Sequence, residues 1–170
     1  TVGPLFAESF PEMGHFGGLF MAMYALPSLL VGWFIGSVTK VFGKKRTAYM
    51  SLMTGSAILV LMGFAETPGM FMAIIFLASF FIAMAWPSVF GTYADYIEEA
   101  PGVEQEIEGV QDFFANAGYV VGPITAGFLA DTIGNASTFA MLGLIGVVVG
   151  VVLLRITPKE ISVKSLRRIK

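Results

Sequence analysis

Cysteine is absent from this 170-residue sequence, and histidine occurs once, at His15. Without cysteine the chain has no disulfide framework, no thiolate nucleophile and no Cys-type zinc site, and one histidine cannot build a His-based metal site. The sequence also lacks the H-E-x-x-H and G-x-S-x-G patterns of many metalloproteases and serine hydrolases. An enzyme is therefore not expected, and no cofactor or metal site is predicted.

Charged residues are also scarce, at 13% of the chain, whereas roughly 25% is typical of soluble domains. Hydrophobic residues make up 56%, and the mean hydropathy is +0.79. A soluble chain of this size would leave large apolar patches exposed to water. The net charge of -2 predicts no nucleic-acid partner. We expect an integral membrane protein whose solvent is the lipid bilayer.

Long apolar windows divide the chain. A helix needs about 20 mainly apolar residues to cross a hydrocarbon core of roughly 30 Å. The windows that satisfy this length are residues 14–39, 47–65, 70–94, 109–130 and 137–154. Residues 1–10 are typical of the end of another, truncated helix that stops at Pro11, and no secretory signal is visible. The sequence predicts an all-α, polytopic transmembrane helix bundle with five complete spans and the end of a sixth.

Basic residues fall on one side of this five-span threading. All ten are predicted there: Lys40, Lys44, Lys45, Arg46, Arg155, Lys159, Lys164, Arg167, Arg168 and Lys170. The positive-inside rule makes that side cytoplasmic. Residues 1–157 are therefore expected to form the transmembrane domain of a multi-pass protein of the inner or plasma membrane. Residues 158–170 are expected to form a basic cytoplasmic tail, whereas the loop at 95–108 on the same side is acidic.

Small residues recur four positions apart, on one face of a helix. These pairs are Gly32 with Gly36, Gly118 with Gly122, and Gly146 with Gly150. Lipid tails are as apolar as leucine, so helices in a bilayer associate where small residues allow close approach. Two interpretations are open at this point. The glycines serve general helix packing, or they form thin faces along which helix bundles rock.

Prolines and tryptophans lie inside the predicted spans. Pro27, Pro87 and Pro123 each remove a backbone donor and favour a kink. Trp33 and Trp86 are flanked by apolar residues, which favours packing in the core, with a cavity wall as the alternative.

A glycine-rich, basic loop joins the first two spans. Residues 36–46 read G-S-V-T-K-V-F-G-K-K-R. The glycines permit a tight turn, and the basic cluster holds the loop in the cytoplasm. The stretch is similar to the loop pattern G-x-x-x-D-x-x-G-[RK]-[RK] of major facilitator superfamily (MFS) transporters. The resemblance implies a gating loop made of Gly36, Lys40, Gly43, Lys44, Lys45 and Arg46. Lys40 departs from the pattern, because the family usually has aspartate there.

Two further stretches carry the same resemblance. Residues 109–131 contain Gly122-Pro123 and resemble the bent fifth helix of each family half, while residues 86–95 resemble the fourth helix. The resemblance covers essentially the whole chain in helix order and loop length. The span at 70–94 contains no arginine and the chain ends in a basic tail, which favours the C-terminal six-helix half. The N-terminal six-helix half of the same transporter is then the expected partner.

Ionisable groups at membrane depth are costly and are therefore functional candidates. Glu8 and His15 are predicted near the outer surface. They form a solvated interfacial pair, or they couple transport to protons, because a partly buried carboxylate exchanges protons near neutrality.

Asp112 and Asn116 share a helical face near the cytoplasmic end of the fourth span. Three interpretations are open. They line the inner mouth of a substrate cavity, Asp112 pairs with Lys40 as an inside lock, or Asp112 is an inert interfacial carboxylate. The other cavity or gate candidates are Trp86, Gly122 and Pro123.

Taken as an MFS half, the chain is expected to belong to a secondary active transporter that works by alternating access. The apolar, aromatic and Met-rich spans favour proton-coupled antiport and efflux of a small molecule. The alternative is a non-transporting membrane scaffold or assembly protein. Asn135-Ala136-Ser137 matches a glycosylation sequon, but it abuts a predicted helix in a very short loop and is expected to be unused.

Overall fold

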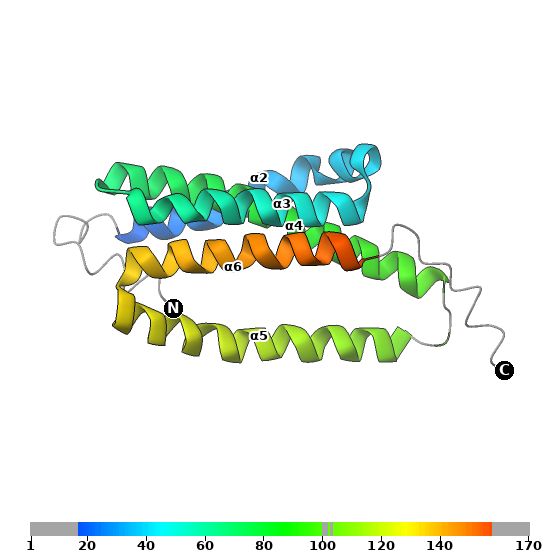
Figure 1. Ribbon diagram of the computed structural model, residues 1–170. Coiled ribbons are helices and arrows are strands. Elements are labelled where there is room, and N and C mark those ends of the chain that lie inside the picture. Colours follow the sequence, from blue (N-terminus) through cyan, green and yellow to red (C-terminus); the bar gives the residue numbers. More distant parts are fainter. Residues whose placement is uncertain (1–16, 100–101, 103, 158–170) are drawn as a thin grey trace.

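The computed structural model describes residues 17–99, 102 and 104–157, and these form a bundle of long helices (Figure 1). The elements are α2 (Gly17–Phe42), α3 (Lys44–Val60), a 3-10 turn η2 (Leu61–Phe64), α4 (Pro68–Glu99), α5 (Glu104–Ile133) and α6 (Asn135–Ile156). The described residues contain five helices long and apolar enough to cross a membrane. The prediction of an all-α, polytopic bundle is confirmed. The expected end of another helix at 1–10 and the basic tail at 158–170 lie outside the described residues.

Successive helices run in opposite directions, so their connections alternate between two ends of the bundle (Figure 1). One end holds the α2–α3 and α4–α5 connections and the end of α6. It carries the basic residues Lys40, Lys44, Lys45, Arg46 and Arg155. We call it the basic end. The other end holds the α3–α4 and α5–α6 connections, where Glu66 and Asp131 are the charged residues of the described ranges.

The helices extend past the apolar windows at the basic end. The acidic stretch at 95–108, which the sequence suggests is a loop, is largely helical, because α4 continues to Glu99 and α5 begins at Glu104. Glu104 and Glu106 lie in the first turn of α5. Negative charge there interacts favourably with the positive end of the helix dipole. A helix end of this kind is stable in water, so it need not stop where the apolar window stops.

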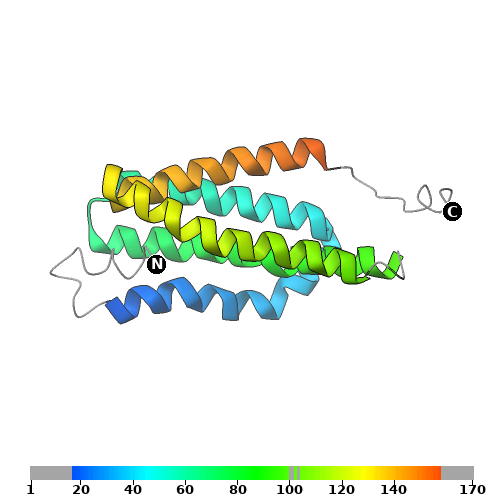
Figure 2. The ribbon, with the colours of Figure 1, turned by 90° about the horizontal axis from the view of Figure 1, so that it is seen from below.

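α3 lies at the centre of the bundle. It packs most extensively against α4 and α6, while α2 packs on α4, and α5 mainly contacts α6 (Figures 1 and 2). Small residues make this approach close. A Cβ added at Gly55 of α3 would lie 2.8 Å from the Ala78 oxygen of α4, and one at Gly143 of α6 would lie 2.6 Å from the Ser56 oxygen of α3. Backbones that approach this closely leave room only for hydrogen at these positions.

Two apolar clusters complete the core. Met62, Phe71 and Ile75 join η2 to α4, with partly buried residues of α2, α3 and α6 packed against them. The second cluster joins α2 to α4 through Val31, Ile35 and Met84. The core therefore lies among α2, α3, α4 and α6, and α5 contributes to it only through Ala126, its one buried residue.

The glycine pairs divide into two groups. Gly146 and Gly150 face Ser56 and Met53 of α3, which supports the packing interpretation for α6. The pairs on α2 and α5 have open space: a Cβ at Gly32, Gly36, Gly118 or Gly122 would meet nothing within 4 Å in the described chain. Thin faces on α2 and α5 are thus left without a partner in this structure. Each predicted proline lies inside a helix that continues through it.

Candidate functional site

A one-residue turn brings three cations to the start of α3. α2 ends at Phe42 and α3 begins at Lys44, so Gly43 alone makes the connection. Its amide donates to the Thr39 oxygen at 2.9 Å, and its oxygen accepts from the Thr47 amide at 3.0 Å. The backbone at Gly43 has φ 84° and ψ 143°, a region that is essentially restricted to glycine. The sequence K-K-R therefore forms the first turn of α3.

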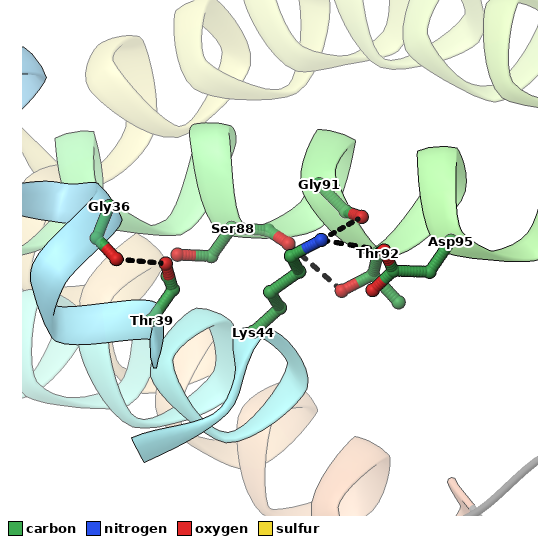
Figure 3. A network of polar contacts seen from close by, with 7 residues as sticks. All are labelled: Gly36, Thr39, Lys44, Ser88, Gly91, Thr92 and Asp95. Carbon is green, nitrogen blue, oxygen red and sulfur yellow. Dashed lines mark hydrogen bonds and ion pairs between the residues drawn. The ribbon is translucent and has the colours of Figure 1, made fainter. Parts of the chain in front are cut away.

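Positive charge is unfavourable at this position, because the N-terminus of a helix already carries about half a positive charge. A carboxylate from α4 compensates. Lys44 Nζ lies 2.6 Å from Asp95 Oδ1 and also donates to the Gly91 oxygen at 3.1 Å (Figure 3). Gly91 and Asp95 are one turn apart near the end of α4, so both of them bind the same ammonium group. We call this arrangement the Lys44–Asp95 latch.

The absence of a side chain at Gly91 leaves room for the Lys44 side chain. The Lys44 stem lies along α4, and a Cβ added at Gly91 would lie 3.2 Å from Lys44 Cδ. The two charged side chains remain 40% and 50% exposed. Ion pairs with this much water access are worth roughly 0.2–1 kcal/mol. The latch therefore links α3 to α4 at the basic end without making that link difficult to break.

Hydroxyl groups beside the latch bond within their own helices. Ser88 donates to the Met84 oxygen at 2.8 Å, and Thr92 donates to the Ser88 oxygen at 2.9 Å. On α2, Thr39 Oγ1 donates to the Ile35 oxygen at 3.0 Å and lies 3.2 Å from the Gly36 oxygen (Figure 3). Because these hydroxyls are satisfied locally, they do not tie α2 to α4.

The predicted Lys40–Asp112 pair is not formed in the described structure. Lys40 is exposed in the last turn of α2, and the described ion pair at this end joins Lys44 to Asp95. The physical reason is the packing order. α2 packs on α4, whereas α5 packs mainly on α6, so the two helices that carry these charges are not close neighbours. Asp112 and Asn116 are exposed on α5, where Asn116 Nδ2 donates to the backbone carbonyl oxygen of Asp112 at 2.8 Å.

The other predicted residues lie on open surfaces. Trp86 is half exposed and stacks on Phe90 with centroids 5.7 Å apart, and Trp33 is 93% exposed. Neither tryptophan is packed in the core of the described chain. Gly122 and Pro123 are exposed on α5. Glu8 and His15 lie outside the described residues.

Asp95 and Gly91 are the site residues that the sequence analysis missed. The signal was present in the antiparallel order of the helices, which brings the end of the third span to the same end as the start of the second. A carboxylate in that last turn is the natural partner for lysine at a helix N-terminus. The described residues hold no group of His, Cys, Asp and Glu suited to a metal ion.

Comparison with known families decides the identity. The family model of the Major Facilitator Superfamily matches residues 2–168. The chain belongs to this superfamily. The searches of curated proteins and of solved structures returned no match. The resemblance inferred from the loop at 36–46 and the Gly122-Pro123 stretch is thereby confirmed at the level of the family.

In this MFS protein most cations of the predicted gating loop lie in a helix and not in a loop. Lys44, Lys45 and Arg46 belong to a helix, and Lys40 occupies the position where the family pattern has aspartate. The acid of the site comes instead from Asp95 of α4. Lys45 lies over the ring of Tyr96, with its Nζ 5.0 Å from the centroid, so adjacent lysines contact different groups of the same helix.

Proposed function

We propose that this MFS membrane transporter is a secondary active transporter that moves a small molecule by alternating access, with proton-coupled efflux as the specific activity. Membership in a transporter superfamily supports this function and a non-enzymatic role. The observation that carries the mechanism is the Lys44–Asp95 latch, a weak link between two helices at one end of the bundle. We assign the basic end to the cytoplasm on the positive-inside rule, and with it the C-terminus in an inner or plasma membrane.

The exposed faces of α2 and α5 support a second half of the transporter. Trp33 and Leu29 of α2 are 93% and 72% exposed, and α5 buries only Ala126. The open glycine pairs lie on the same two helices. Thin, apolar helix faces are the surfaces along which membrane bundles pack and move. In our proposal the N-terminal six-helix half covers α2 and α5, and this chain is the C-terminal half.

The latch would act as an inner gate. With α3 tied to α4 at Lys44 and Asp95, the basic end of this half is held in one arrangement, and its release permits another. An interaction of roughly 0.2–1 kcal/mol biases such an equilibrium by up to about fivefold and does not lock it. Asp112, Asn116, Trp86, Gly122 and Pro123 remain cavity candidates in this proposal, and Glu8 and His15 remain candidates for proton coupling.

Transport can be tested with ethidium, an apolar aromatic cation, in everted vesicles from cells that express the open reading frame containing this chain. We expect uptake that requires a pH gradient and stops when nigericin collapses it. Lys44→Asp and Asp95→Lys should each reduce the uptake rate, and the exchange of both charges should restore much of it. Asp131→Lys is the matched control, because it makes the same charge change as Asp95→Lys at an exposed position of the opposite end of the bundle.

The outcomes separate the parts of the proposal. Gradient-driven uptake that the charge exchange does not restore would reject the latch as a gate and retain the transporter. Absence of gradient-driven uptake for ethidium and for a panel of further small molecules would favour the second candidate, a non-transporting scaffold or assembly protein. That candidate also predicts an open reading frame without a further set of six helices.

A further inference from the structure

A small pocket lies between α3 and α4 at the basic end, next to the latch. Its lining is mainly apolar and aromatic, and it includes Ala48 and Tyr49 of α3 and Val89, Tyr93 and Tyr96 of α4. The volume of the pocket is about 110 Å³. Since an apolar cavity of about 150 Å³ can hold benzene, this pocket has room for one aliphatic side chain.

The charged residue of the lining is Lys45, and its ammonium group is already engaged. Lys45 Nζ lies over the Tyr96 ring, 5.0 Å from the centroid. A cation in this position is attracted by the electrons of the ring face. The remaining space, between Ala48 and Val89, is therefore suited to an uncharged, apolar group.

The end of α6 brings the following residues to the edge of this pocket. The Tyr49 hydroxyl lies 3.0 Å from Thr157 Oγ1. Thr157 is extended, with φ -74° and ψ 121°, a conformation that a following proline favours. Residue 158 is proline, which would clash with the preceding turn of a continuing helix. The chain therefore leaves α6 beside Tyr49, which is a lining residue of the pocket.

The basic tail, residues 158–170, lies outside the described residues and carries an apolar side chain within reach of the pocket. Ile161 follows Thr157 by four positions, and an extended chain spans at most about 3.3–3.6 Å per residue, or about 13 Å over this distance. A helix with its side chains is about 10–12 Å across. From Thr157, Ile161 can therefore cross the width of α3 and enter the pocket.

Charge complementarity favours the same path. Beyond Ile161 the tail is rich in basic residues, namely Lys164, Arg167, Arg168 and Lys170. The end of α4 and the start of α5 carry exposed acidic residues, namely Glu98, Glu99, Glu104, Glu106 and Glu108. The described ion pair at this end joins Lys44 to Asp95 and involves none of these acids. A basic segment that crosses the pocket from α6 would next meet this acidic surface.

We infer that the pocket is a docking site for the tail of this chain. Ile161 fills the pocket, and the basic residues that follow lie against the acidic ends of α4 and α5. Since α4 and α6 both end at the basic end (Figure 1), the docked tail ties α6 to α4 across α3, beside the latch. This inference is independent of the cargo and of transport, because it requires only the packing of α3, α4 and α6.

Engineered cysteines test the position of Ile161, because the chain has no native cysteine. Cysteine is a small hydrophobic residue and should keep the place of Ile161 in the pocket. Thr92 lines the pocket, whereas Ala94 is exposed on the same helix and is not part of the lining. The full chain is oxidised with copper phenanthroline in non-ionic detergent micelles. Ile161→Cys should form a disulfide with Thr92→Cys at least about tenfold faster than with Ala94→Cys, since the two Cα atoms must lie within about 7 Å.

The membrane surface is the competing site for a basic tail, because anionic lipids attract lysine and arginine. The two cysteine pairs are therefore also compared in vesicles that contain phosphatidylglycerol, an anionic lipid. Docking predicts that the Thr92 pair keeps its faster rate there. Loss of this advantage in the vesicles would overturn the proposal and assign the tail to the membrane surface.

Limited digestion with trypsin tests the side chain of Ile161 itself. Cleavage after Lys164 is followed by mass spectrometry in the full chain. Ile161→Ser should accelerate this cleavage by about tenfold or more, because the burial of an isoleucine side chain is lost. Ile169→Ser is the matched control, since it makes the same change later in the same tail, and its cleavage rate should stay close to that of the wild type.

Equal disulfide rates for the Thr92 and Ala94 pairs in micelles would overturn the proposal. Should a cysteine variant not give a monodisperse protein, the digestion decides, because its two substitutions lie in the tail and leave the described helices unchanged. Equal cleavage of Ile161→Ser and Ile169→Ser would then reject the docking of Ile161.

Discussion

The contact between α3 and α6 predicts a large effect from a single methyl group. A Cβ at Gly143 of α6 would lie 2.6 Å from the Ser56 oxygen and 2.8 Å from the Val60 nitrogen, which are both backbone atoms of α3. A flexible side chain could move away from the new atom, but a helix backbone moves only if the whole helix shifts. Gly143→Ala must therefore separate α3 from α6 by several tenths of an ångström.

Overpacking of this kind costs typically 1–3 kcal/mol. Alanine is favoured over glycine inside a helix by about 1 kcal/mol, and this gain offsets part of the cost. We expect a net loss on the order of 1 kcal/mol, which corresponds to a melting temperature lower by about 2–4 °C for a chain of this size. Gly118→Ala on α5 is the matched control, because a Cβ there meets nothing within 4 Å in the described chain. It should keep the propensity gain and melt at or above the wild-type temperature.

The assay is thermal unfolding of the 170-residue chain alone in detergent micelles, where no second half covers α5. Unfolding is followed by intrinsic fluorescence and by loss of the monodisperse peak in gel filtration. Gly150→Ala adds an intermediate case, because its new Cβ would meet the flexible Met53 side chain instead of backbone. The expected order of melting temperatures is Gly118→Ala, then Gly150→Ala, then Gly143→Ala. A Gly143→Ala protein as stable as Gly118→Ala would refute the close approach of α3 and α6.

Three further predictions concern the turns and the topology. Gly43→Ala should destabilise the protein by roughly 1–3 kcal/mol, because Gly43 has a positive φ. Gly69→Ala is the control and should leave the stability unchanged, since Gly69 has open space and no positive φ. The melting temperatures of the two variants test this difference. Asn135 should stay unmodified when the chain is expressed in cells with an N-glycosylation pathway, because it is half-buried at the start of α6, and an endoglycosidase-sensitive band shift would contradict this. Since native cysteine is absent, single cysteines at Glu66 and Lys40 should react with an impermeant maleimide from opposite sides of the membrane; labelling of both from one side would disprove the threading.

The helical fold could be predicted because its signal is local. A run of about 20 apolar residues specifies a membrane helix, and the five windows each fall within or overlap one helix of the structure. The helix ends were harder to predict, because α4 and α5 continue past the apolar windows through charged residues. Hydropathy predicts which residues lie in the membrane, whereas backbone hydrogen bonding and the helix dipole determine where the helix ends.

The site was only partly predictable because pairing depends on which helices are neighbours. Lys44 was recognised as part of the loop, but its carboxylate partner is 51 residues away in the sequence. Choosing Asp95 over Asp112 requires knowing that α3 packs on α4. The small residues Thr47, Ser51 and Gly55 of α3, spaced four apart and buried, carried a usable signal for that neighbour. Only one of these three residues is glycine, so the spacing of glycine pairs alone does not reveal this stripe.

The distribution of close contacts gives the proposed alternating access a physical basis. α3 meets α4 and α6 at Gly55 and Gly143 through backbone contacts that tolerate no added methyl group, so the helix segments around these contacts should move as one rigid body. α5 is buried only at Ala126, and the glycine pairs of α2 and α5 meet nothing in the described chain. A rigid core with thin outer faces can rock against a second half without repacking. The Lys44–Asp95 latch lies at the basic end, beyond those contacts. An exposed ion pair contributes at most about 1 kcal/mol. A substrate that binds one arrangement more tightly can therefore shift the equilibrium between the latched and unlatched states.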